Sequence, residues 1–252
     1  MLEDNNRQLS QLVTAVDRQS EFPFPRLRKD AEPTVAQAEA PPPVQGPSVP
    51  STDVQGEDLE PIKIELPEAF FGGTPIEYWD AHLETESNKP RPPFLAPRGT
   101  VNVAKGKPAA SSAAPLQGDL AQLTDGDKDY NKRSLIELPA GLQWVQIDLG
   151  AEYKLYAVLV WHFHEGKRVY HDIVVQVGND AEFKDAVTTI YNNDFDDSAG
   201  LGVGQDMEYV ENHKGRLMDA KGINARYVRL YSQGNTANDM NNYVEVEVFG
   251  MK

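Results

Sequence analysis

Apolar and polar residues alternate along the second half of the chain in the way that β-strands require. Residues 144–149 (WVQIDL) alternate, and residues 243–249 (YVEVEVF) keep a strict period of two. Residues 156–163 (YAVLVWHF) form a more continuous apolar run, which is typical of a strand that is buried on both faces. Residues 169–177 follow after a turn at 165–167, so we expect a hairpin between these two runs.

Further short runs at 187–191 and 227–231 bring the expected number of strands to at least six. Glycine, asparagine and aspartate separate the runs, as is typical of tight turns between strands. Short strands at this spacing indicate an all-β fold, a jelly-roll-like β-sandwich. The pattern places this domain at residues 100–252, which is long enough to bury a core without disulfides.

The first hundred residues have a different pattern. Apolar residues recur every seven positions within residues 1–20, which predicts one short amphipathic helix that is either frayed or docked on a partner. Residues 21–60 contain many prolines and few large apolar residues, as expected of a disordered or polyproline-like linker. Residues 61–99, the arm, combine prolines with many aliphatic and aromatic residues. Because so much apolar surface is costly to leave in water, we expect the arm to lie extended over the following domain or over a partner.

Composition supports a boundary near residue 100. Of the 18 prolines, 15 lie in residues 1–100, whereas 14 of the 19 glycines lie in residues 101–252. The formal net charge of −15 argues against a nucleic-acid-binding protein. The absence of cysteine excludes disulfides, thiol catalysis and cysteine-based metal sites. No apolar run is long enough to span a bilayer and no signal peptide is visible, so we expect a peripheral membrane association at most.

Four stretches of the second half, taken in order, resemble the discoidin or coagulation-factor type C domain, a galactose-binding-like β-sandwich. The resemblance spans about residues 102–250, and two features depart from it. No cysteine pair links the ends of the domain, and residues 192–222 form an insertion. The four stretches are residues 102–108 (NVAKGKP) with Ser111 and Ser112, residues 123–127 (LTDGD), residues 144–150 (WVQIDLG), and residues 225–230 (ARYVRL) with residues 245–250 (EVEVFG).

The resemblance implies a structural calcium ion. In calcium-binding members of the family, a loop corresponding to residues 123–127 and a carboxylate on the last strand hold the ion. The corresponding groups here are the carbonyl of Leu123 and the carboxylates of Asp125, Asp127 and Glu245, all of them the hard oxygen ligands that calcium prefers. The alternative is an Asx-turn in which Asp125 bonds the backbone and no ion is bound.

The resemblance also implies carbohydrate binding through loops at one end of the sandwich. Carbohydrate-binding members often use a histidine, an arginine and an asparagine for the sugar hydroxyls and one aromatic ring for the apolar face of the sugar. By analogous position, His164, Arg168, Asn235 and Tyr243 are the candidates here. The alternative is that these residues only satisfy the turns in which they lie.

Three histidines invite a zinc hypothesis, which we do not favour. His162 and His164 lie two positions apart on an expected strand, and His171 follows across the expected hairpin. A catalytic zinc also requires an open coordination position and partners that orient its ligands. A surface or core-edge role is therefore the preferred interpretation.

The insertion contains many acidic residues and one glycine-rich stretch. The aspartates at 194, 196 and 197 could hold a second cation, but acidic runs usually remain hydrated, so we expect a solvated loop. The glycines at 200, 202 and 204 lack the strand, helix and Lys-Ser/Thr sequence of a nucleotide-binding loop. The sequence therefore gives no nucleotide site.

These features favour a binding module over an enzyme. No pair of carboxylates can be placed across a cleft from the sequence, and no nucleophile elbow is recognisable. We therefore expect a non-catalytic module that binds a glycan outside the cytoplasm, in the periplasm, in the cell envelope or as a secreted protein. The alternative is an accessory or structural subunit of a larger envelope complex, in which residues 1–99 bind another protein subunit.

Overall fold

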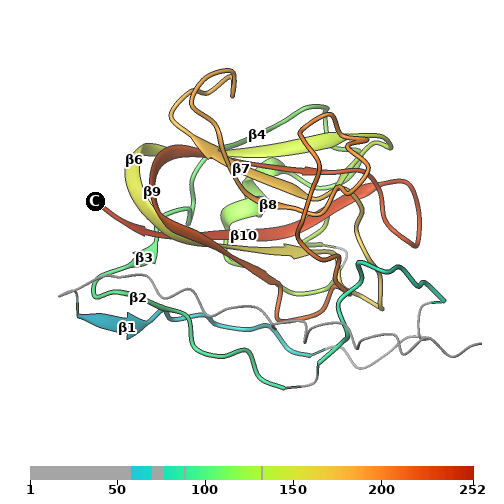
Figure 1. Ribbon diagram of the computed structural model, residues 1–252, viewed down its shortest axis with the longest axis horizontal. Helices are drawn as coiled ribbons and strands as arrows, with labels where there is room; N and C mark the ends of the chain where they lie inside the picture. The colour runs from blue at the N-terminus through green and yellow to red at the C-terminus, as the bar shows by residue number, and fades with distance from the viewer. Residues whose placement is uncertain (1–57, 70–76, 88, 132) are drawn as a thin grey trace, which may run out of the picture. The chain divides into compact units, whose positions relative to one another are not determined.

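The computed structural model describes residues 58–69, 77–87, 89–131 and 133–252 (Figure 1). They belong to a compact unit, Ser51–Lys252. The expected helix within residues 1–20 lies outside the described residues, as does the expected linker apart from residues 58–60. In the described ranges no helix has the length and apolarity that crossing a membrane requires. The elements are β1 (Leu59–Pro61), β2 (Leu95–Pro97), β3 (Val101–Asn102), β4 (Ala109–Ser111), the 3₁₀ helix η1 (Leu120–Thr124), β5 (Ile136–Leu138), β6 (Gln143–His162), β7 (Val174–Gly178), β8 (Thr188–Asn192), β9 (Arg216–Ser232) and β10 (Asn241–Met251).

The strands after residue 100 form one continuous sheet that folds over itself, which confirms the predicted all-β sandwich. Its order is β3-β10-β6-β9-β7-β8, with β4 paired to β6 and β5 paired to β10. The long strands β6 and β9 pair along both halves, and their register shifts between Asp148 and Tyr153. Gly150 lies in this bend with φ +81, a backbone conformation that glycine adopts without strain. The first half of β6 therefore pairs with β4 and its second half with β10.

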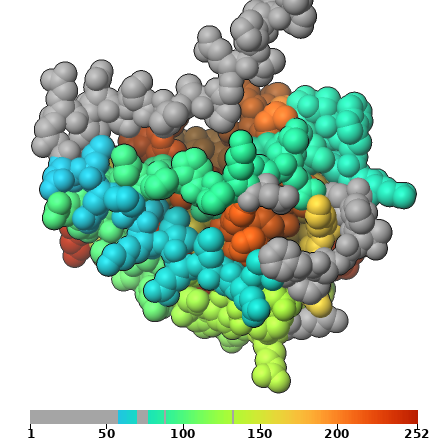
Figure 2. Space-filling view, turned by 90° about the horizontal axis from the view of Figure 1, so that it is seen from below, coloured from blue at the N-terminus to red at the C-terminus, as the bar shows by residue number. Residues whose placement is uncertain are grey.

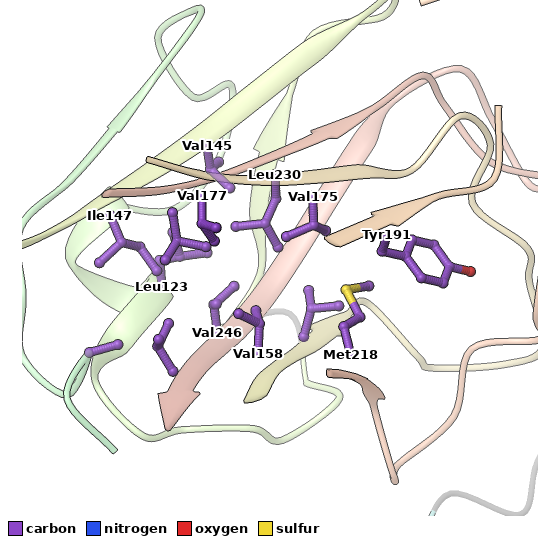
Figure 3. Close-up of a cluster of buried hydrophobic side chains, with 14 of the residues drawn as sticks. Leu123, Val145, Ile147, Val158, Val175, Val177, Tyr191, Met218, Leu230 and Val246 are labelled. Carbon is purple, nitrogen blue, oxygen red and sulfur yellow. The ribbon is translucent and has the colours of Figure 1, made fainter. Parts of the chain in front are cut away.

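The core lies between the two halves of this folded sheet. Val145, Ile147 and Leu149 of the alternating run at 144–149 are fully buried, whereas Trp144 at its start is partly exposed. Figure 3 shows Val145 and Ile147 from this run on one side of the core, with Val158 and Val246 on the other. Burial of such β-branched side chains from strands far apart in the sequence is the main stabilising contribution to a fold of this size.

The predicted hairpin between residues 156–163 and 169–177 is wrong. Strand β7 pairs with β8 and β9, not with β6. The reason is that residues 154–162 of β6 already pair with β10 on one edge and, over much of their length, with β9 on the other. The chain therefore leaves β6 at His162 and crosses to the other half of the sheet before β7 begins.

The strict period of two predicted for residues 243–249 is broken at its start. The pairing of β10 with β6 shifts register between Tyr243 and Glu245, which is the effect of a β-bulge. Because one extra residue reverses the faces of the residues before it, Tyr243 shares the core with Val246 and Val248. Val244 instead belongs to a second apolar cluster on the outer face of β6 and β10.

The arm packs on that outer face. Strands β1 and β2 pair with each other, and the Ile62 amide donates to the Phe94 carbonyl at 3.0 Å. Ile62, Ile64 and Phe94 pack against the outer cluster, in which Trp161 is fully buried. In Figure 2 the cyan and teal atoms of the arm lie across this face of the molecule. We call residues 59–64 and 94–97 the arm base.

Between the two segments of the base, the arm reaches the loops at the end of β6 and the start of β9. The Leu83 backbone forms a parallel bridge with Glu208. Glu84 accepts two hydrogen bonds from the Arg216 guanidinium, at 2.7 and 2.8 Å. Glu86 forms an ion pair with Lys167 at 2.7 Å. We call residues 77–87 the arm tip; its contacts with the sandwich are mainly polar.

Candidate functional site

The predicted calcium loop follows the helix η1. Asp119 caps this helix, and Leu123 in its last turn is fully buried. After the helix, Asp125 Oδ1 accepts the Asp127 amide at 2.7 Å. Asp127 Oδ2 in turn accepts the Ser134 hydroxyl at 2.6 Å. The Asx-turn of the alternative interpretation is therefore present, and Asp127 Oδ1 also accepts the Asp129 amide at 3.1 Å.

Glu245 on β10 lies against this loop. Its Oε2 accepts the Gly126 amide at 3.1 Å, while its buried Oε1 has no hydrogen-bond partner. Burial, together with the negative charges of Asp125 and Glu247, raises the pKa of the Glu245 carboxyl to about 9. A buried carboxylate with an unpaired oxygen is costly unless a cation neutralises it. The residues present therefore fit a calcium ion, although the three carboxylates are not gathered as tightly as those of the next cluster.

The tightest acidic cluster lies elsewhere. In the part of the chain that the structure describes, one group of three acidic or histidine ligands has all its ligand atoms within 4.8 Å, namely Asp172, Asp194 and Asp196. Burial and the charges of the other two raise the pKa of Asp172. Asp194 is fully buried and accepts the amides of Ser198 and Ala199. The expectation that the aspartates at 194, 196 and 197 lie in a solvated loop is therefore wrong at Asp194, whose buried carboxylate accepts backbone amides of that loop.

Two of the predicted sugar-binding residues are held inside the protein. Tyr243 is fully buried, and its hydroxyl lies 2.9 Å from the Ser232 hydroxyl. The bulge that turns Tyr243 inward leaves its ring with no exposed face for a sugar. The Asn235 side chain forms hydrogen bonds within its own turn, since its Oδ1 accepts the Ala237 amide and its Nδ2 donates to the Met240 carbonyl. These two residues match the alternative role of satisfying turns and core.

The other two predicted residues carry unpaired polar atoms. His164 Nδ1 lies 3.0 Å from the His162 carbonyl, whereas the buried His164 Nε2 has no partner. The Arg168 guanidinium stacks on the Phe163 ring at 5.0 Å and donates to the Glu165 carbonyl, but its buried Nε has no partner. Tyr130 lies edge-on to the His164 ring, with 6.2 Å between the centroids.

Backbone contacts bring the loops of these residues together. The Gln233 amide donates to the His171 carbonyl, and the His171 amide donates to the Gly234 carbonyl. A bridge between Tyr170 and Asn235 extends the contact. We call residues 163–171 and 233–240 the loop end of the sandwich.

The three histidines do not converge. His162 lies in the core, stacked on Tyr170 at 4.4 Å, with its Nδ1 3.1 Å from Glu211. His171 instead lies 3.2 Å from Glu208. Among the described residues these histidines form no cluster of metal ligands. His162 is fully buried, which is deeper than the surface or core-edge role expected for it.

Sequence reasoning missed the polar contacts between the arm and the sandwich. Arg216 lies on β9. Burial lowers its pKa, but its hydrogen bonds to Glu84 and the electrostatic effect of Glu84, Tyr191 and Tyr209 outweigh burial, so that the pKa is raised. Tyr78 of the arm donates to Glu208 at 2.7 Å. The partners are separated by 130 positions or more along the chain, so no local pattern could have paired them.

One surface cavity lies away from all of these groups. Its volume is about 440 Å³, and Tyr153, Tyr156, Lys154 and Lys252 are among its lining residues. The two ammonium groups lie over the two rings, 5.7 to 5.8 Å from the centroids. No predicted site residue lines this cavity.

Comparison with known proteins identifies the family of the sandwich domain. Residues 108–246 match the F5/8 type C domain. A family 89 glycoside hydrolase from Clostridium perfringens, solved with GlcNAc-alpha-1,4-galactose, is 18% identical with a TM-score of 0.46; the match covers 60% of this chain but 15% of the hydrolase. A Streptococcus pneumoniae fucose binding module is 20% identical with a TM-score of 0.43, covering 61% of this chain and 97% of the module. A chitosan-binding module from a Paenibacillus chitosanase/glucanase is 20% identical with a TM-score of 0.40, covering 59% of this chain and 98% of the module. No curated protein matches the sequence.

Proposed function

The chain belongs to the F5/8 type C domain family, and on that basis we propose that it is a non-catalytic module that recognises a glycan. The observation that carries the proposal is the pair of unpaired buried atoms at the loop end, His164 Nε2 and Arg168 Nε. Nearly all buried polar atoms in proteins have a hydrogen-bond partner. Sugar hydroxyls donate and accept hydrogen bonds, so they would satisfy both atoms.

The aromatic part of the site differs from the expectation. Because the Tyr243 ring is buried in the core, it does not serve a sugar. Tyr130 is partly exposed beside His164, and we assign the sugar-facing ring to it. Aromatic rings pack well against the apolar face of a sugar while polar groups fix its hydroxyls.

A glycan array with the full chain, followed by calorimetry, tests this function. The variant Arg168→Ala should weaken binding of the sugar so found roughly tenfold or more, because it removes a charged hydrogen-bond donor. Arg226→Ala is the matched control, since that guanidinium pairs with Asp148 on the sheet surface. Absence of binding to every sugar, or equal loss in both variants, would remove the glycan from the proposal.

We also propose a structural calcium ion held by the Leu123 carbonyl and the carboxylates of Asp125, Asp127 and Glu245. The unpaired, buried Glu245 Oε1 supports this set. A bound divalent ion would join the loop to β10 and stabilise the fold without taking part in chemistry.

Thermal unfolding with calcium and with a chelator tests the ion. Calcium should raise the melting temperature of the parent, and Glu245→Gln should abolish that rise. Asp196→Asn is the matched control in the other acidic cluster. If the calcium-dependent rise in melting temperature persists in Glu245→Gln but disappears in Asp196→Asn, the ion binds the Asp172, Asp194 and Asp196 cluster instead. A melting temperature that calcium does not change would refute the calcium site.

A second candidate function is an accessory subunit of a larger complex outside the cytoplasm. Trp79 on the arm favours it, because its side chain is 84% exposed and tryptophan is enriched in protein interfaces. Either function implies a location in the periplasm, in the envelope or outside the cell, which cell fractionation tests. Co-purification of a partner that Trp79→Ala abolishes, together with no sugar binding, would favour the subunit.

A further inference from the structure

Arg216 sits in a setting built to hold a carboxylate. Its guanidinium lies 4.7 Å from the centroid of the Tyr209 ring and 5.3 Å from that of Tyr191. Both terminal nitrogens donate to the two oxygens of Glu84. Two parallel hydrogen bonds from one guanidinium are the geometry by which arginine recognises planar carboxylates.

Four buried polar atoms of Arg216 and the residues around it lack a hydrogen-bond partner. Arg216 Nε, the Tyr209 hydroxyl, Glu211 Oε1 and His162 Nε2 are buried without a hydrogen-bond partner. Arg216 stacks on the Tyr209 ring, and Glu211 Oε2 lies 3.1 Å from His162 Nδ1. Buried polar atoms with a purely structural role normally have hydrogen-bond partners. These four unpaired atoms therefore indicate that the groups bind another polar molecule.

The local charge also favours an anion. Arg91 is mostly buried and donates to the Gly215 carbonyl at 2.6 Å. Burial lowers the pKa of Arg91, and repulsion from the Arg216 charge lowers it further, which places the two guanidinium groups near each other. Against them stand the carboxylates of Glu84, from the arm, and Glu211, from the sandwich. Removing Glu84 therefore leaves an excess of positive charge at this point.

The occupant, Glu84, belongs to the more weakly held part of the arm. The Glu84 side chain is 40% exposed, and the Glu86–Lys167 pair beside it is similarly exposed. Exposed ion pairs contribute little to stability, whereas the arm base is packed on apolar side chains. The tip can therefore leave Arg216 while the base stays in place.

We propose that Arg216 is the centre of a second ligand site, which takes the carboxylate of an acidic sugar, and that Glu84 occupies it as an internal substitute. That the carboxylate is carried by a sugar rests on the proposed glycan function. The sugar carboxylate would accept the two guanidinium hydrogen bonds that Glu84 accepts in the structure. Binding would require displacement of the arm tip.

Calorimetry with methyl β-D-glucuronide, and with methyl β-D-glucoside as its neutral match, tests the site on the full chain. Glu84→Gln should bind the glucuronide roughly tenfold more tightly than the parent, because the internal competitor is removed. In the Glu84→Gln background, Arg216→Lys should weaken that binding, since lysine keeps the charge but not the planar fork. Glu86→Gln, which breaks the neighbouring ion pair at the tip, should bind as the parent does.

An affinity that Glu84→Gln leaves unchanged, or equal binding of the glucoside, would overturn the inference. So would full retention of glucuronide binding in Arg216→Lys, with folding checked by the melting temperature. The loop end is tested separately in the same titrations. In the Glu84→Gln background, Arg168→Ala should abolish binding of neutral glycans and leave binding of the glucuronide intact. If neutral glycans bind and the glucuronide does not, the Arg216 site is overturned while the loop-end function stands.

Discussion

The two parts of the arm touch the same sandwich by different chemistry. At the base, Ile62, Ile64 and Phe94 pack on an outer cluster that includes Trp161. At the tip, the contacts are hydrogen bonds and ion pairs from Glu84 and its neighbours. Apolar burial is non-directional and is not weakened by salt, whereas exposed ion pairs contribute little free energy and salt screens their attraction.

The difference between the apolar contacts of the base and the polar contacts of the tip indicates where the folded domain begins. A sandwich cut at residue 100 would expose the outer cluster and leave Lys128 without the Glu65 carbonyl that it contacts at 2.9 Å. The arm base is therefore part of the folding unit, while the tip is a ligand-like segment lying on it. Four changes break or sharpen this comparison.

The largest effect is expected beneath the base. Trp161→Ala should lower the free energy of unfolding by about 3–5 kcal/mol, because it empties the centre of the outer cluster. It also removes the indole bond to the His213 carbonyl. Denaturant unfolding measures the loss, with the exposed Trp79→Ala as the matched control at within about 0.5 kcal/mol. Equal losses for the two tryptophans would refute a stabilising outer cluster beneath the base.

The next effect is expected in the base itself. Phe94→Ala should cost about 1–2 kcal/mol, since its ring is only partly buried against the cluster. Its neighbour Leu95 is 54% exposed, so Leu95→Ala should cost less. A Phe94 variant as stable as the parent would mean that the base, like the tip, rests loosely on the sandwich.

A smaller effect is expected at the tip. Glu84→Gln should change the free energy of unfolding by about 1 kcal/mol or less, as for other partly exposed ion pairs. Arg216 can then be hydrated once the tip moves. A loss of more than about 3 kcal/mol, the range for breaking a buried pair, would show that the tip is as structural as the base.

The smallest effect requires no mutation. In 1 M sodium chloride, where charges are screened beyond about 3 Å, amide exchange should accelerate at Glu84 and Glu208. These amides donate to the Glu208 and His82 carbonyls between tip and sandwich. The Ile62 amide of the base should be unaffected. Hydrogen-exchange mass spectrometry compares the two, and equal acceleration would erase the distinction.

Much of the fold could be predicted because local patterns determine it. The alternation at residues 144–149 gave the correct inward positions of Val145 and Ile147. The bulge before Glu245 could not be predicted, because a register shift depends on the partner strand and leaves no mark on the alternation of its own strand. The hairpin failed for a similar reason, since the partners of β6 come from β9 and β10.

The candidate sites divide in the same way. The loop of Asp125 and Asp127 and the carboxylate of Glu245 came from motifs whose order the family fixes, and the structure brings Glu245 against that loop. Tyr243 was misplaced because its role depended on the unseen bulge. Arg216 and Glu84 meet from segments with no periodic or motif signal, so only the folded structure pairs them.

Glycan recognition at the loop end is the central claim, and hydrogen exchange with a bound oligosaccharide tests it most directly. The ligand is the sugar with the highest affinity on the array, added at saturation to the full chain. We predict slower amide exchange at residues 163–171 and 233–240 and no change in amide exchange at the bend around Gly150. Failure of every sugar to bind, or protection confined to residues outside the loop end and Arg216, would contradict the account.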